Sequence, residues 1–270
     1  MIVNTNTCFL PWLFDCFGAG CLCSWRFGWI VSLHRLKYTG KISFLYQEPT
    51  FYQRKKLTRG LKKSMNNESV AWEDEYRSKG AVWGGAVHHL PLVPSGSRVL
   101  ELGCGNGKTL SALTGRNWDV TAIDFSKRAV TMSRMHTGIQ RNGDACVADA
   151  CFLPFAMERF DAVFAIHILS HLNRHDRSVA VAQAVRVLKT GGILYFSGFS
   201  AEDFRYGKGT VVEPGSVLRG SGICTHYFNE PEIRDLFSTI TIQAITTERW
   251  SMHVRGQVFP RAEIHATFIR

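Results

Sequence analysis

The apolar positions between residues 97 and 200 fall into short blocks separated by loops and helical stretches. Five blocks have the pattern of buried strands: 98–102, 120–124, 146–149, 160–166 and 191–197. One helical stretch starts near Lys108, and another follows Ser126 and runs toward Gln140. Strands that alternate with helices are typical of a parallel sheet covered on both faces. In the tail, 240–245 and 262–268 alternate with period two, which predicts two further strands.

The first predicted strand ends at a glycine-rich turn, Gly103-Cys104-Gly105-Asn106-Gly107. Glycine lets a ligand approach the backbone closely and permits positive φ. The helix that follows offers unpaired N–H groups at its N-terminus. Lys108 stands where a dinucleotide fingerprint has its third glycine, and Leu102 stands where a phosphate-binding loop has its first. The turn therefore predicts a nucleotide site and argues against those two motifs.

Two of the predicted strands end in an acidic residue. Asp124 closes the second strand, 23 residues after Glu101, and Asp149 closes the third. A carboxylate at the end of a second strand is well placed to accept hydrogen bonds from both hydroxyls of a ribose. Ser126 is placed to cap the helix after Asp124.

Composition allows one large domain and excludes a mainly disordered chain, a collagen-like repeat and a polytopic membrane protein. The 270 residues are 45% hydrophobic, and the net charge is +10. Residues 1–64 hold ten basic and two acidic side chains, so +8 of this charge lies there and only +2 in 65–270. The eight cysteines form no C-x-x-C pair. We therefore expect no metal site and a reduced, cytoplasmic protein.

The sequence predicts two parts, an N-terminal extension at 1–64 and a main domain at 65–270. The extension is basic and aromatic, but charges and a proline interrupt its apolar run, which is too short to cross a membrane. Three interpretations remain open. The extension is a poorly ordered tail, an arm that binds a partner or an anionic membrane surface, or a product of start-codon assignment, with Met65 as the true start.

The motifs, taken together and in order, resemble those of class I S-adenosylmethionine-dependent methyltransferases. They are VLELGCGNG at 99–107, AIDFS at 122–126, ADA at 148–150 with LPF at 153–155, FDAV at 160–163 and RVLKTGGIL at 186–194. The resemblance implies a methyltransferase with a doubly wound, Rossmann-like α/β fold. Its seven-stranded sheet is parallel except for one antiparallel strand in the C-terminal hairpin.

The resemblance also implies a cofactor, S-adenosylmethionine, which is released as S-adenosylhomocysteine. Asp124 is expected to bind the ribose hydroxyls, Phe125 to lie against adenine, and Asp149 with the Ala150 N–H to bind the adenine edge. Glu101 is expected to belong to the network that fixes the loop. Further cofactor contacts are expected from Gly103, Cys104 through its backbone, Gly105 and Ala165.

The acceptor is narrowed by what the sequence omits. Methyltransferases of exocyclic amines in nucleic acids carry an Asn/Asp-Pro-Pro-aromatic motif after the fourth strand, where this chain has Ala165-Ile166-His167-Ile168. It also contains no Pro-Cys dipeptide that would supply a pyrimidine C5 nucleophile. With a nearly neutral main domain, these omissions argue against nucleic acid and favour a small-molecule acceptor.

Four side chains are candidates for the acceptor side. His167 lies just past the fourth strand and is either a contact or base at the methyl donor, or an ordinary core histidine. Between the fifth strand and the final hairpin, Arg205 could hold an anionic acceptor, and His226 or Tyr227 could orient or deprotonate one. Upstream, the aromatic residues around Trp72 either close over the cofactor or cover a sheet edge. Those residues are Trp72, Tyr76 and Trp83.

Two rival functions stay open. One is methylation of RNA or protein, with the basic extension as an electrostatic guide. The other is a non-catalytic subunit that binds the cofactor. The sequence does not reveal the oligomeric state.

Overall fold

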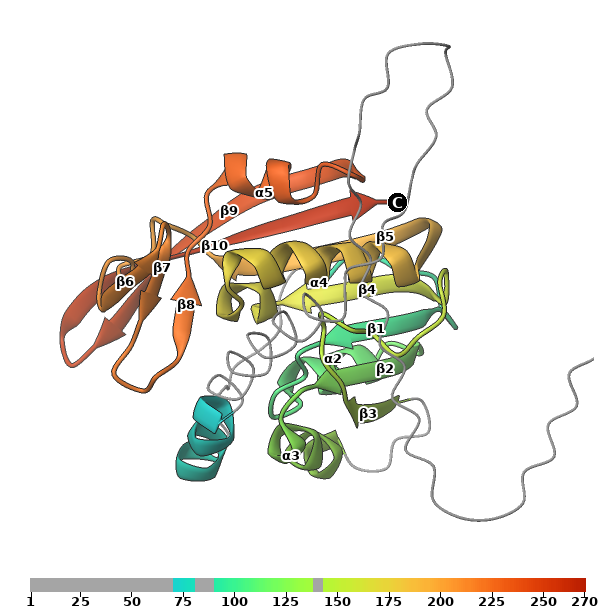
Figure 1. Ribbon diagram of the computed structural model, residues 1–270, viewed down its shortest axis with the longest axis horizontal. Helices are drawn as coiled ribbons and strands as arrows, with labels where there is room; N and C mark the ends of the chain where they lie inside the picture. Colours follow the sequence, from blue (N-terminus) through green and yellow to red (C-terminus); the bar gives the residue numbers. More distant parts are fainter. Residues whose placement is uncertain (1–69, 81–89, 138–142) are drawn as a thin grey trace, which may run out of the picture. The chain divides into compact units, whose positions relative to one another are not determined.

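The computed structural model describes residues 70–80, 90–137 and 143–270, all within the compact unit Gly60–Arg270 (Figure 1). The predicted extension at 1–64, the proposed start at Met65, and Trp83 lie outside the described residues.

A seven-stranded sheet forms the centre of this unit, in the order β3-β2-β1-β4-β5-β10-β9. The first five strands pair in parallel, and β10 runs antiparallel to both of its neighbours. The strands are β1 (Arg98–Leu102), β2 (Asp119–Asp124), β3 (Gly143–Val147), β4 (Phe160–Ile166), β5 (Leu188–Phe199), β9 (Thr241–Val254) and β10 (Gln257–Ile269). The predicted fold is confirmed.

Helices cover the two faces of the sheet because apolar side chains alternate between them. The larger core joins Leu100 and Phe196 to residues of α4 (Arg174–Val187) and α5 (Glu230–Leu236). On the other face, Val99 and Phe164 pack against α2 (Lys108–Thr114), with α3 (Lys127–Thr137) alongside. Each such side chain contributes roughly 1.5–3 kcal/mol when it is buried. The sheet is therefore held between two layers of helices.

Smaller elements surround the carboxyl ends of the parallel strands. A helix covers residues 70–79, and the 3₁₀ helix η1 (Ile168–His171) follows β4 directly. A three-stranded antiparallel sheet lies between β5 and α5 in the chain, in the order β6-β7-β8. Its strands are β6 (Thr210–Glu213), β7 (Ser216–Leu218) and β8 (Cys224–His226).

The strand boundaries correct three expectations. β3 ends at Val147, so Asp149 lies in the loop after the strand instead of closing it. β5 is longer than 191–197 at both ends. The final hairpin continues far beyond the predicted 240–245 and 262–268, because β9 and β10 stay paired from Thr241 and Ile269 to the tip. Both sides of this ribbon are exposed near its tip, so no apolar alternation marks it in the sequence.

Candidate active site

The candidate site lies at the carboxyl ends of β1, β2 and β4, where open α/β sheets bind their ligands. The glycine-rich turn joins β1 to α2 there, with Gly103, Gly105 and Gly107 all at positive φ. A Cβ atom on Gly107 would lie 2.9 Å from the Ser133 Cα, and one on Gly105 would lie 3.0 Å from the Tyr76 hydroxyl oxygen. The turn therefore requires glycine for its conformation and for its close packing.

Asp124 ties the turn to the end of β2. Its Oδ2 accepts the Gly105 N–H at 3.0 Å, and its Oδ1 accepts the Ser126 N–H at 2.9 Å. The side chain is 6% exposed, and burial raises its pKa to about 6. Each carboxylate oxygen has a second lone pair, so the group can also accept hydrogen bonds from a ligand. Ser126 caps α3 as predicted, because its Oγ accepts the Ala129 N–H at 3.0 Å.

Glu101 is buried beneath the turn. It is 2% exposed, and its Oε2 has no hydrogen-bond partner among the described residues. A buried acceptor that lacks a partner costs roughly 1–3 kcal/mol. A ligand that brings a positive charge or a donor to this oxygen would remove that cost. A cationic, nucleoside-containing cofactor therefore fits Glu101, the glycine turn and Asp124.

The protonation of Glu101 leads to a prediction about stability. Burial and the Asp124 carboxylate raise its pKa from 4.5 to about 8. Because the folded pKa exceeds the unfolded pKa, the stabilising contribution is complete below about pH 4.5 and is lost as the pH rises through about 8. We expect the urea midpoint of the cofactor-free protein to fall more steeply from about pH 5 to pH 8 than that of Glu101→Gln, which cannot ionise. Parallel pH profiles would contradict this assignment.

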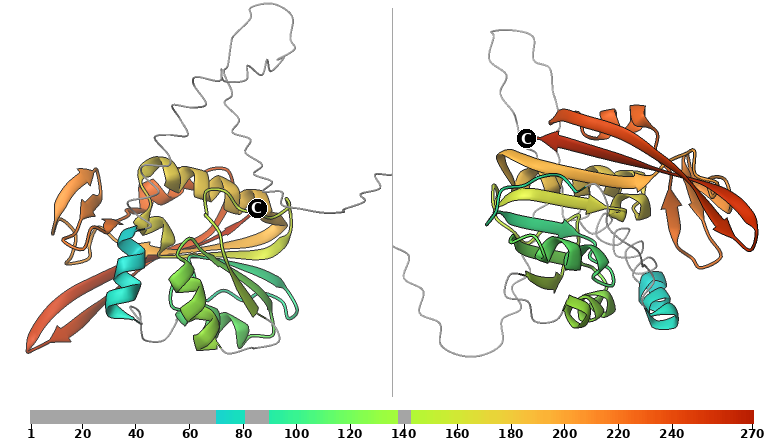
Figure 2. Two further views of the ribbon diagram at one scale, coloured as in Figure 1. Left: turned by 60° about the horizontal axis from the view of Figure 1, so that its bottom comes forward. Right: turned by 180° about the vertical axis from the view of Figure 1, so that it is seen from behind.

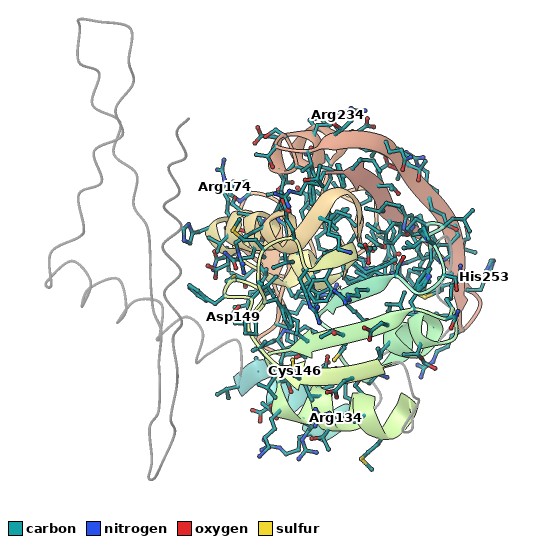
Figure 3. The ribbon with its side chains drawn as sticks, turned by 90° about the vertical axis from the view of Figure 1, so that its right-hand side faces the viewer. Arg134, Cys146, Asp149, Arg174, Arg234 and His253 are labelled. Carbon is teal, nitrogen blue, oxygen red and sulfur yellow. The ribbon has the colours of Figure 1, made fainter. Side chains whose placement is uncertain are left out.

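The predicted adenine contacts lie near each other at the ends of β2 and β3. Phe125 is 39% exposed, so its ring is accessible to a ligand. Asp149 lies in the loop that follows Cys146 and β3 (Figure 3), where its Oδ1 accepts the Cys151 N–H at 2.8 Å. Ala150 is buried beside it, and Ala165 is buried near the end of β4. The adenine role of these residues remains a prediction.

The helix at 70–79 covers the glycine turn and the start of α3. Its Glu73 carboxylate accepts the Ser126 hydroxyl at 2.8 Å and the Arg128 N–H at 3.3 Å. Tyr76 is buried against the turn, and Trp72 meets the His171 ring edge-on at 4.8 Å between ring centroids. Of the two interpretations of these aromatic residues, this packing favours closure over the cofactor.

Two of the predicted acceptor residues meet at the Phe199 ring. His167 stacks on this ring at 4.6 Å between centroids, and the Arg205 guanidinium lies 4.4 Å from its centroid. Buried Asp203 accepts the Arg205 Nε–H at 2.7 Å and so fixes the guanidinium at this ring. Burial, together with neighbouring cations such as Lys108, lowers the pKa of His167. A neutral histidine with a low pKa is a poor general base but can still hydrogen-bond to an acceptor.

Glu263 completes this group, and the sequence analysis missed it. Its Oε2 lies 3.6 Å from the His167 Nε2, and burial raises its pKa. In the period-two pattern of 262–268, Ile264, Ala266 and Phe268 face the larger core, so Glu263 faces the opposite side. The alternating pattern could have shown which face of the sheet carries Glu263. Only the pairing of β10 with β5, however, places Glu263 beside His167.

His226 and Tyr227 belong to a structural network. The His226 Nδ1 lies 2.7 Å from the Ser216 Oγ and its Nε2 lies 2.8 Å from a Glu232 oxygen, so neither ring nitrogen is available to an acceptor. The Tyr227 hydroxyl accepts a hydrogen bond from Arg219 at 2.6 Å. Both side chains are at most 2% exposed. This geometry does not support the predicted role of His226 as a base, because the ring links β7 and β8 to α5.

The described residues lack two features, a metal-binding cluster and a membrane-spanning helix. No group of three or more His, Cys, Asp or Glu side chains there is arranged to hold a metal ion. None of the described helices is both long and apolar enough to span a membrane.

A family model described as a methyltransferase domain matches residues 100–196. The solved structure of a SAM-dependent methyltransferase from Methanosarcina mazei superposes with a TM-score of 0.56 at 22% identity, over 66% of this chain and 94% of that one. Residues 100–196 therefore form a methyltransferase domain, and S-adenosylmethionine is the methyl donor that the solved relative's name gives for such a fold.

Curated relatives give a more particular comparison. The chain is 30% identical to the tRNA N(3)-cytidine methyltransferase METTL2 of Gallus gallus over 162 residues, which are 55% of this chain and 43% of the relative. It is 29% identical to the tRNA (carboxymethyluridine(34)-5-O)-methyltransferase alkbh8 of Xenopus tropicalis over 185 residues, 66% of this chain and 26% of that one. The chain thus spans less than half the length of these relatives.

Proposed function

We propose that this protein methylates a nucleotide of RNA, and specifically of a tRNA, with S-adenosylmethionine as the donor. The observation that carries the proposal is the similarity to two kinds of tRNA methyltransferase across the domain. It favours RNA over the small-molecule acceptor that the neutral domain and missing motifs suggested. Solved structures below 25% identity share the fold and do not discriminate between acceptors.

The cofactor half of the proposal rests on the loop and strand ends. Glu101, the glycine turn and Asp124 would hold the cofactor, with Phe125 and Asp149 at its adenine. When bound, S-adenosylmethionine would supply a methyl group activated by its sulfonium sulfur. In an in-line displacement the acceptor takes this methyl group and S-adenosylhomocysteine is the leaving group. The contribution of the protein is alignment, which can supply roughly 7–11 kcal/mol of the barrier. The helix at 70–79 would exclude water above the turn.

The charge around Phe199 favours a ring nitrogen as the acceptor atom. An unprotonated ring nitrogen of cytosine is neutral and becomes cationic when it is methylated, so the reaction needs a nearby negative charge and no base. Glu263 supplies such a charge beside His167, while Asp203 is shared between Arg205 and Arg261. A carboxylate acceptor would instead lose charge on methylation and would be repelled by Glu263. The Glu263 carboxylate is the feature that favours a cytosine-like acceptor over an acidic one.

A labelling experiment tests this function. The purified full chain is incubated with tritiated-methyl S-adenosylmethionine and either total tRNA, a protein extract freed of RNA, or a metabolite extract. We expect acid-precipitable label with tRNA that is released by ribonuclease. Label confined to the protein or metabolite fraction would overturn the proposal.

A further inference from the structure

The ribbon formed by the ends of β9 and β10 continues from the candidate acceptor site. β10 pairs with β5 only from Glu263 to Ile269, whereas its pairing with β9 continues to Gln257 and Val254. Figures 1 and 2 show these paired ends extending past the rest of the sheet. At about 3.3 Å per residue, the stretch from Glu263 to Phe259 covers roughly 13 Å.

One face of the ribbon carries cations beside aromatic rings. Arg261 is paired with Trp250 across the strands, and its guanidinium lies 5.2 Å from the Trp250 ring centroid. Phe259, on the same face, packs on Phe204 at 4.9 Å between centroids. Lys208 in turn lies 4.6 Å from the Phe204 centroid. We call Tyr206, Lys208, Trp250 and Arg261 the ribbon face.

A buried carboxylate fixes the arginines of this region. Asp203 has a fully buried side chain and accepts the Nε–H of Arg205 and that of Arg261, each at 2.7 Å. Arg261 therefore holds one orientation beside Trp250, while Arg205 stays at Phe199. Such preorganisation reduces the entropy lost when a ligand binds.

The exposed members of the ribbon face have the chemistry of a site for single-stranded nucleic acid. Trp250 is 38% exposed and Tyr206 is 46% exposed, and the Lys208 side chain is exposed as well. Bases stack on aromatic side chains at such sites, and cations follow the phosphates. Sequence-specific RNA recognition commonly uses loops whose bases are unstacked. A nucleotide whose ring nitrogen is methylated must also leave its stack.

We propose that the ribbon face binds the nucleotides that flank the acceptor in a single-stranded RNA loop. Lys208 and Arg261 contact phosphates, and Trp250 and Tyr206 stack on flanking bases. This inference rests on the proposed function, because it requires an RNA acceptor at the Glu263 end of the face.

The test measures binding of a fluorescein-labelled RNA stem–loop with a seven-nucleotide loop to the full chain, by anisotropy. We expect Lys208→Glu and Trp250→Ala each to weaken binding about 10-fold, and Trp250→Phe to stay within about 2-fold because it keeps a ring for stacking. The matched control is Arg134→Glu, an exposed residue of α3 (Figure 3), which packs on β3 at the far edge of the sheet from β9. It should also stay within about 2-fold.

The outcomes separate the two proposals. Unchanged affinity in Lys208→Glu and Trp250→Ala, while the wild-type chain binds and methylates RNA, overturns the ribbon face and leaves the proposed function intact. A wild-type chain that neither binds nor methylates RNA overturns both. S-adenosylhomocysteine affinity is measured in parallel. If a variant loses RNA affinity and cofactor affinity equally, its effect is structural and the assignment of that residue to the ribbon face is overturned. Lys208 is the decisive position because its side chain is exposed and its substitution should not disturb the fold.

Discussion

Replacing Asp124 with alanine is expected to weaken S-adenosylhomocysteine binding about 100-fold, because two hydrogen bonds to a charged acceptor are lost. The carboxylate also accepts the Gly105 and Ser126 N–H groups, so its loss loosens the turn that contacts the ligand. Asp124→Asn keeps one acceptor oxygen and should lose about 10-fold. Calorimetric titration measures both values.

The control for Asp124 is a carboxylate on the neighbouring strand. Asp144 lies in β3, is largely exposed and pairs with Arg134. Asp144→Ala should bind the product as the wild type does. If Asp124→Ala keeps wild-type affinity and melting temperature, its assignment to the ribose is wrong.

Replacing Glu263 with glutamine is expected to lower the rate constant of methyl transfer to RNA about 100-fold while leaving cofactor affinity unchanged. The reason is electrostatic, because a preorganised charge beside a developing charge typically contributes 10²–10³-fold. Glutamine has nearly the same shape, so the contact with His167 should persist. Single-turnover kinetics with saturating RNA separates this effect from binding.

The effect of Glu263→Gln on binding distinguishes the acceptor. With either kind of acceptor, the acceptor atom becomes more positive as the methyl group arrives, so removing the carboxylate slows the transfer step. A carboxylate acceptor would also be repelled by Glu263 in the bound complex, so the substitution would tighten RNA binding, whereas a neutral ring nitrogen leaves the binding nearly unchanged. An unchanged rate would remove Glu263 from the acceptor site, and tighter RNA binding would contradict a ring nitrogen.

The cofactor half of the site could be predicted from the sequence because local spacing determines it. The glycine turn follows β1 directly, and Asp124 ends β2, so the parallel pairing of β1 with β2 brings them together. The cap at Ser126 follows from an equally local pattern, whereas the seven-stranded sheet was implied by the family resemblance. To predict the cofactor half of the site, it was enough to locate the glycine turn and the ends of the strands in the sequence.

The acceptor half depends on contacts between distant segments. Glu263 meets His167 only because β10 pairs with β5. In this pairing Glu263 lies opposite Phe199, which precedes it by 64 residues in the chain. His226 resembled a catalytic residue in the sequence, yet Ser216 and Glu232 occupy both of its nitrogens. The net charge of 65–270 averages the domain, so it does not reveal the cations that gather around Asp203.

The most direct test of RNA methylation uses a deuterated methyl group. The full chain is incubated with S-adenosylmethionine carrying a trideuterated methyl and with unmodified tRNA transcripts, which are then digested and analysed by nucleoside mass spectrometry. We expect label in 3-methylcytidine, lost in Asp124→Ala and much reduced in Glu263→Gln. Absence of label from every nucleoside, with the protein folded and S-adenosylhomocysteine bound, would contradict the account.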